Sequence, residues 1–183
     1  MIALDGPVNL LSTIGRVLQG LLLSTLLALA EEIGWRGYLL PHLLPLGRTR
    51  ALLGSGLLHG IWHLPILLLT PFYHEGGDRL VVAMLFVLSV TVGSVFFGYL
   101  RLTSASVWPA ALGHGAFNLF WGTFMGITVA VGPSSVLEYW AGESGVITLI
   151  EVTLLAGWLL YRLDRQASPA PGQAVLVSEP LKP

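Results

Sequence analysis

Five apolar stretches separated by short polar turns make up most of the chain. They cover residues 8–40, 51–70, 80–100, 107–131 and 145–163. Each is close to or longer than the roughly 20 residues that an α-helix needs to cross a bilayer. Pro41, Pro45 and Gly47 follow the first stretch, and we expect them to end its helix near Leu40. The pattern predicts an all-α fold, a polytopic transmembrane helical bundle of about five membrane segments.

The composition supports this prediction and narrows the functions to consider. The 183 residues are 54% hydrophobic and only 10% charged, whereas soluble domains are about a quarter charged. A net charge of −1 gives no reason to expect a nucleic-acid partner. The chain has no cysteine, which excludes disulfides, a thiol nucleophile and thiolate metal ligands.

One bundle would occupy residues 1–163. The segment 164–183 is rich in Pro and Ala and has few large apolar residues, so we expect a disordered C-terminal tail. The first residues lack the basic segment of a secretory signal, so we expect no cleaved signal peptide.

Basic residues fall on alternate turns of the predicted bundle. These residues are Arg48, Arg50, Arg101, Arg162 and Arg165. Cytoplasmic loops of membrane proteins carry an excess of Lys and Arg. We therefore expect an integral protein of a bacterial plasma membrane, with its N-terminus outside and its C-terminus in the cytoplasm.

Polar residues interrupt three of the apolar stretches in closely spaced groups. They are Glu31, Glu32 and Arg36 on the first stretch, His59 and His63 on the second, and His114 and Asn118 on the fourth. Charged groups inside a membrane are costly and need partners or a water-filled cavity. We expect the three groups to meet at one cavity, with the glutamates near the cytoplasmic end of the first helix.

The helical spacing predicts that the side chains of Glu31 and Glu32 point in different directions. Glu32 and Arg36 are four residues apart and share a helix face, so they can form an ion pair. Glu31 is rotated by about 100° from Glu32, so it is left for chemistry. A carboxylate, imidazoles and an amide around one cavity can activate a water molecule and bind an oxyanion. No Ser, Cys or Lys stands as an evident nucleophile beside a base, which favours attack by water.

At these residues the chain resembles a known family. E-E-I-G-W-R-G at 31–37 matches the E-E-x-x-x-R motif of the CAAX prenyl protease and bacteriocin-processing family, also called CPBP or Abi. H-G-I-W-H at 59–63 is similar to its F-x-x-x-H motif, with His59 in place of Phe, and H-G-A-F-N at 114–118 is similar to its H-x-x-x-N motif. The likeness covers residues 21–118.

The resemblance implies an intramembrane glutamic endopeptidase that needs no metal or other cofactor. Its substrate would be a peptide or membrane protein, met within membrane lipid. Glu31 would activate water and His63 would assist it. His114 and Asn118 would stabilise the oxyanion. Glu32 and Arg36 would shape the site, with His59 in a supporting position.

Two other functions are compatible with the same residues. In a zinc-dependent membrane hydrolase, His59, His63 and His114 would bind the metal and Glu31 would act as base. In a non-enzymatic immunity or membrane-binding protein, the polar residues would serve only as structure. Membrane bundles do use buried polar side chains for interhelical hydrogen bonds.

Overall fold

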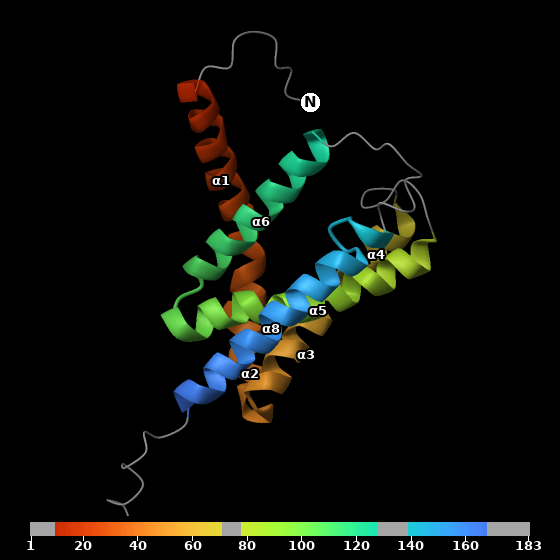
Figure 1. Ribbon diagram of the computed structural model, residues 1–183. Helices are drawn as coiled ribbons and strands as arrows, with labels where there is room; N and C mark the ends of the chain where they lie inside the picture. The colour runs from red at the N-terminus through yellow and green to blue at the C-terminus, as the bar shows by residue number, and fades with distance from the viewer. Residues whose placement is uncertain (1–9, 71–77, 128–138, 168–183) are drawn as a thin grey trace, which may run out of the picture.

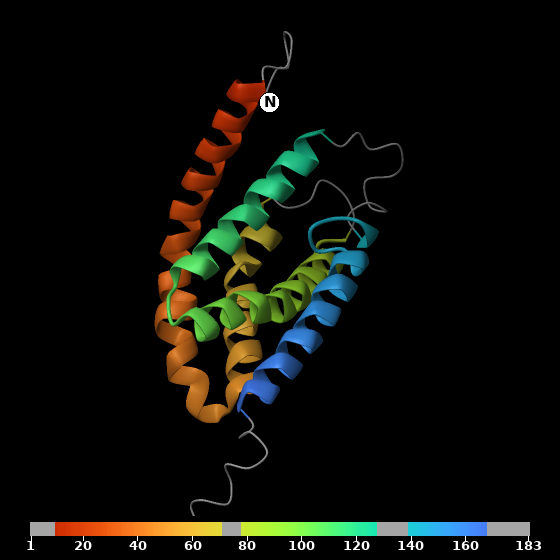
Figure 2. The same ribbon diagram turned by 60° about the vertical axis from the view of Figure 1, so that its left-hand side comes forward.

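The protein is a bundle of long helices in which α5 lies at the centre (Figures 1 and 2). The computed structural model describes residues 10–70, 78–127 and 139–167, and all regular secondary structure within these ranges is helical. The larger helices are α1 (Leu10–Glu32), α3 (Arg48–Trp62), α5 (Arg79–Ser104), α6 (Trp108–Ile127) and α8 (Val146–Ala167). The predicted all-α fold is confirmed. Helix α8 continues four residues past the predicted boundary at 163, and residues 168–183 lie outside the described residues.

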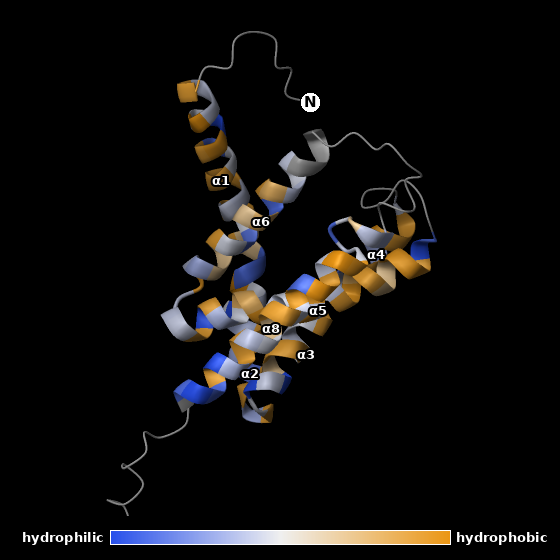
Figure 3. Cartoon of the chain, in the orientation of Figure 1, coloured by the Kyte–Doolittle hydropathy of each residue, from blue (hydrophilic) through white to orange (hydrophobic). Residues whose placement is uncertain are grey.

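Four of the five predicted segments are long and apolar enough to cross a membrane. Among the described residues these spans are Leu10–Leu46, Arg48–Leu69, Arg79–Ser104 and Val146–Gln166. The fourth predicted segment forms α6, which does not meet the same criterion over its described length. Hydrophobic residues run along the helices (Figure 3), and many large ones are exposed: Leu11 is 79% and Leu154 71% exposed. Such a surface suits contact with lipid.

The first helix does not end where the prolines predicted. After α1 the chain forms a π-helical segment η1 (Ile33–Leu39), then α2 (Leu40–Leu43) and a short 3₁₀ turn η2 (Leu44–Leu46). Pro41 lies in the first turn of α2, where its missing N–H and its ring are tolerated because the preceding turn is wide. Gly47, with φ 97°, ends the helical run.

This continuation corrects the predicted position of the glutamate pair. Glu32 is followed by about 14 more helical residues, or about 20 Å at 1.5 Å per residue. The pair ends α1, as predicted, but it lies inside the longer span Leu10–Leu46 and not at the end of that span. Helix α3 returns from Gly47, which brings His59 back to the level of the glutamates.

Glycines let α3 and α6 lie close to their neighbours. A Cβ atom at Gly56 would be 2.4 Å from the Thr91 carbonyl oxygen on α5, and one at Gly115 would be 2.6 Å from the Thr25 backbone on α1. A buried apolar cluster joins α2, α3, α5 and α8. Its members are Leu40, Ala51, Leu52, Val95, Ala156, Leu159 and Leu163. These contacts fix the helices whose polar residues form the site.

The two ends of the bundle are each held by a basic side chain. At one end Arg48 Nη1 donates to the Leu163 carbonyl, 2.8 Å away, and joins the start of α3 to the last turns of α8. At the other end Arg79 Nη1 donates to the Leu68 carbonyl on α4 (Leu64–Leu69), 2.9 Å away. Arg48 and the arginines near the end of α8 therefore lie at the same end of the bundle.

Candidate active site

Glu31 and Glu32 point into different environments, as their spacing predicted. Glu32 is fully buried, whereas the side chain of Glu31 is 32% exposed. The two residues end α1, and consecutive helical side chains diverge by about 100°. One carboxylate therefore faces the packed interior and the other faces open space.

The buried carboxylate of Glu32 is held by two donors. Arg36 Nη1 donates to Glu32 Oε1 at 2.7 Å, and His114 Nδ1 donates to the same oxygen at 2.9 Å. Arg36 is only 1% exposed, and its guanidinium lies 5.1 Å from the centre of the Phe97 ring. The predicted ion pair between Glu32 and Arg36 is confirmed. The guanidinium compensates a carboxylate that would otherwise be costly to bury.

His114 contacts both the buried carboxylate of Glu32 and the cavity. Its ring stacks on Phe97, with ring centres 5.2 Å apart, and it lines the cavity that Glu31 also lines. Because a carboxylate only accepts hydrogen bonds, Nδ1 of His114 carries a proton. Nε2 then accepts a hydrogen bond in the neutral ring and donates one only in the doubly protonated ring.

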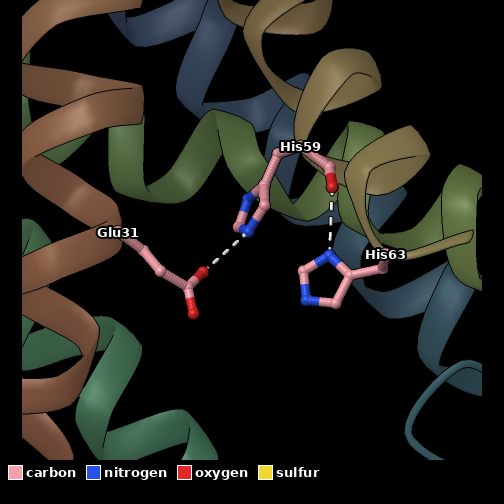
Figure 4. Close-up of side chains that lie close together, drawn as sticks. All are labelled: Glu31, His59 and His63. Atoms are coloured by element: carbon pink, nitrogen blue, oxygen red, sulfur yellow. Dashed lines mark hydrogen bonds and ion pairs between the residues drawn. The ribbon is translucent and has the colours of Figure 1, made fainter. Parts of the chain in front are cut away.

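Glu31 is bonded to His59 (Figure 4). His59 Nε2 donates to Glu31 Oε2 at 3.1 Å, and the His59 ring is 4.8 Å from the stacked ring of Trp35 in η1. His59 is only 4% exposed. The residue that departs from the resembled motif is thus the direct partner of the more exposed glutamate.

His63 lies at the break between α3 and α4. Pro65 has no N–H and cannot continue α3, so the chain restarts as α4 after His63. His63 Nδ1 donates to the His59 carbonyl at 3.0 Å (Figure 4). This bond fixes the proton on Nδ1, so Nε2 is the basic nitrogen of the neutral ring.

A cavity of about 280 Å³ lies where α1, α3, α5, α6 and the start of α8 converge. Most of its walls are apolar side chains of α5 and α8. Besides serine and threonine hydroxyls, six titratable or amide side chains line it: Glu31, His59, His63, His114, Asn118 and Glu143. The three predicted groups of polar residues therefore do meet at one cavity, with Glu32 and Arg36 directly behind it.

Glu143 is a cavity residue that the motifs did not predict. It precedes α8 and comes from no apolar stretch, so only the packing of α8 on α5 brings it to the site. Burial raises the pKa of the Glu143 carboxyl, and the nearby His114 ring opposes that shift. Trp35 and Phe97, which pack on His59 and His114, were likewise not predicted as site residues.

Glu31, His59 and His63 could together hold a metal ion. Each offers one ligand atom, and these atoms all lie within 4.8 Å of one another. This group differs from the predicted zinc set, which used His114 and kept Glu31 as base. In the described structure His114 Nδ1 is bonded to Glu32 instead.

The comparisons with known proteins agree with the motifs. The profile of the family described as type II CAAX prenyl endopeptidase Rce1-like matches residues 13–120. No curated protein and no solved structure matches the chain. The matched region is more than half of the chain and contains all seven predicted site residues. The family is one of intramembrane proteases, which implies a peptide substrate and a membrane environment. The chain therefore belongs to the type II CAAX prenyl endopeptidase Rce1-like family.

Proposed function

We propose that this protein is a glutamic endopeptidase in which Glu31 activates the attacking water. The observation that carries the proposal is the contrast between the glutamates. Glu32 is committed to Arg36 and His114, whereas Glu31 lines the cavity and is partly exposed. A general base must lie within hydrogen-bond reach of the water that it deprotonates.

The distances leave room for such a water molecule. The facing atoms of Glu31, His59 and His63 lie within 4.8 Å of one another. Two hydrogen bonds of about 2.8 Å can bridge atoms up to about 5.6 Å apart. A single water could thus contact Glu31 and His63 together. Glu31 would take its proton as the oxygen attacks the peptide carbonyl, and the proton would then pass to the leaving amine.

His114 and Asn118 would stabilise the oxyanion that this attack creates. Both line the same cavity as Glu31. Because His114 Nδ1–H is used by Glu32, His114 can donate from Nε2 only when the ring is doubly protonated. The hydrogen bond to Glu32 holds the His114 ring in one orientation at the cavity.

The test is proteolysis of a membrane-peptide library by the purified protein in detergent or proteoliposomes. We expect turnover by wild type and its loss in both Glu31→Gln and His63→Ala. Glu151→Gln is the matched control, because Glu151 is exposed on α8 and does not line the cavity. A well-folded wild type without turnover, or full turnover in Glu31→Gln, would contradict the proposal.

One observation favours a second candidate, a metal-dependent hydrolase. Glu31, His59 and His63 provide a carboxylate and two imidazoles, three ligands that suit zinc and leave a fourth position for water. The two candidates differ in their response to metal removal. The glutamic mechanism predicts turnover that is indifferent to a chelator, whereas the metal mechanism predicts turnover that is lost with chelator and restored by zinc.

We also propose the orientation that the arginines predicted, with the C-terminus on the cytoplasmic side of a bacterial plasma membrane. Arg48 and the last turns of α8 lie at one end of the bundle, which supports a common side for these basic residues. A C-terminal fluorescent-protein fusion should fluoresce, because such reporters fold in the cytoplasm. A periplasmic reporter at the same position should stay inactive.

A further inference from the structure

Glu143 is a second carboxyl group of the cavity, and the mechanism above does not use it. It lies beyond the residues that the family profile matches, which end at 120. It is half-buried and lines the same cavity as Glu31 and His114. A titratable group in such a place is a candidate for a role in binding.

The turn that carries Glu143 is firmly built. Thr148 Oγ1 and the Gly145 N–H both donate to the Gly142 carbonyl, each at 2.9 Å. Gly145 packs so tightly that a Cβ atom there would lie 2.7 Å from the Trp140 backbone. Glu143 therefore has a fixed backbone position at the cavity, set by the first turn of α8.

Among the described residues that line the cavity, Glu143 faces no permanently charged cation. Within the described part of the chain, the cavity lining includes no Lys or Arg. Burial raises the pKa of Glu143, since the ionised carboxyl loses hydration without gaining a strong partner. Much of the neighbouring wall is apolar, including Phe86, Val90 and Val152. The cavity therefore suits a group that combines an apolar stem with a positive head.

We propose that Glu143 determines substrate specificity by binding a Lys or Arg side chain of the peptide close to the bond that is cleaved. Long basic side chains bury an apolar stem and present a cationic head. The stem would contact the apolar wall and the head would pair with Glu143. Because Glu143 and Glu31 share one cavity, the basic residue lies within a few positions of the cleaved bond. This inference rests on the proposed function, since it requires a peptide in the cavity.

The experiment uses pairs of peptides that differ only by Lys or Gln at one position, scanned along the sequence. Binding is measured by fluorescence anisotropy in the Glu31→Gln background, and kcat/KM is measured with active Glu31. Both are done in non-ionic detergent without lipid, so that only the peptide supplies a cation. At one position we expect a preference for Lys of about fivefold, the size of one partly exposed ion pair.

Variants of Glu143 test whether the preference for Lys over Gln depends on this carboxyl group. The Lys/Gln ratio should fall to about one in Glu143→Gln, should persist in Glu143→Asp, and should give way to a preference for acidic peptides in Glu143→Lys. Glu151→Gln, which alters an acid outside the cavity, should keep the ratio. A Lys preference that survives in folded Glu143→Gln, or no preference at any position, overturns the inference.

The two proposals can fail separately. A Lys preference in binding that depends on Glu143, together with a wild type that does not cleave, supports the recognition site and overturns the endopeptidase. Cleavage that requires Glu31 but shows no preference for Lys supports the endopeptidase and overturns the recognition site.

Discussion

Glu31 and Glu32 are neighbours in the sequence, yet they have opposite surroundings. Glu32 is fully buried and accepts hydrogen bonds from Arg36 and His114, whereas Glu31 is partly exposed and bonded to His59 at a cavity. The chemical group is the same in both. The difference shows that a helix can present one carboxylate to the protein core and the next to a cavity merely through its rotation per residue.

The different surroundings of the two glutamates predict that one contributes to stability and the other to catalysis. If it is right, changes at Glu32 and Arg36 act mainly on folding, and changes at Glu31 act mainly on turnover. Breaking a buried ion pair leaves an uncompensated charge, which costs stability. Removing a general base leaves the fold in place but raises the barrier of the reaction.

The largest effect is expected from Glu31→Gln. We expect kcat/KM to fall by about 10²–10⁴, the usual contribution of a general base. The amide is nearly isosteric and can still accept a hydrogen bond from His59, so the thermal unfolding midpoint should stay close to that of wild type. Peptide cleavage and thermal unfolding, measured on the same preparation, check the loss of activity and the unchanged stability. Cleavage within tenfold of wild type would sink the assigned role of Glu31.

Arg36→Leu should instead destabilise the protein, by about 3–5 kcal/mol, because it strands the buried carboxylate of Glu32. The double variant Glu32→Leu with Arg36→Leu should recover part of that loss, since it removes both charges. Thermal or denaturant unfolding in detergent gives the coupling between the two positions. Strictly additive single effects would show that the pair does not act as a unit.

Much of this site could be predicted from the sequence because helical periodicity is local. Spacings of four residues placed Glu32 with Arg36, and the rotation of one residue placed Glu31 apart from them. That the three polar groups meet was inferred from the cost of charges in an apolar bundle. These inferences need no knowledge of how distant helices pack.

The parts that could not be predicted depend on packing between distant segments. The helix continues past Pro41 because η1 widens just before it and Leu40 joins a buried cluster with α3, α5 and α8. His59 was expected only in a supporting position. Its hydrogen bond to Glu31 depends on how far α3 is shifted along α1, which the sequence does not specify. Glu143 reaches the cavity only because α8 packs on α5.

A smaller effect is expected when the partner of Glu31 is removed. His59→Phe restores the aromatic residue of the resembled motif and can keep the stacking on Trp35, but it removes the hydrogen bond to Glu31. A hydrogen bond to a charged group is worth roughly 1.5–3 kcal/mol, so we expect kcat/KM to fall by about 10- to 150-fold.

His42→Phe is the matched control, because the His42 ring donates to the Tyr38 carbonyl and does not line the cavity. Peptide cleavage by both variants checks the prediction. Activity in His59→Phe equal to that of His42→Phe would mean that His59 serves packing alone, and that Glu31 is positioned without it.

The smallest expected effect concerns the pH dependence of specificity, and it extends the comparison to Glu143. Because burial raises the pKa of this carboxyl, Glu143 becomes charged at a higher pH than an exposed glutamate does. Below that raised pKa the carboxyl is neutral and cannot favour a cation, whereas above it the carboxylate can. The preference for Lys over Gln should therefore rise with pH, by about three- to fivefold once the carboxyl is ionised. The ratio of kcat/KM for paired peptides is the right measurement, because changes in the catalytic step affect both peptides alike, and the pH dependence of the ratio should disappear in Glu143→Gln. A ratio that stays constant with pH, in a protein that still prefers Lys, would place the recognition on a group other than Glu143.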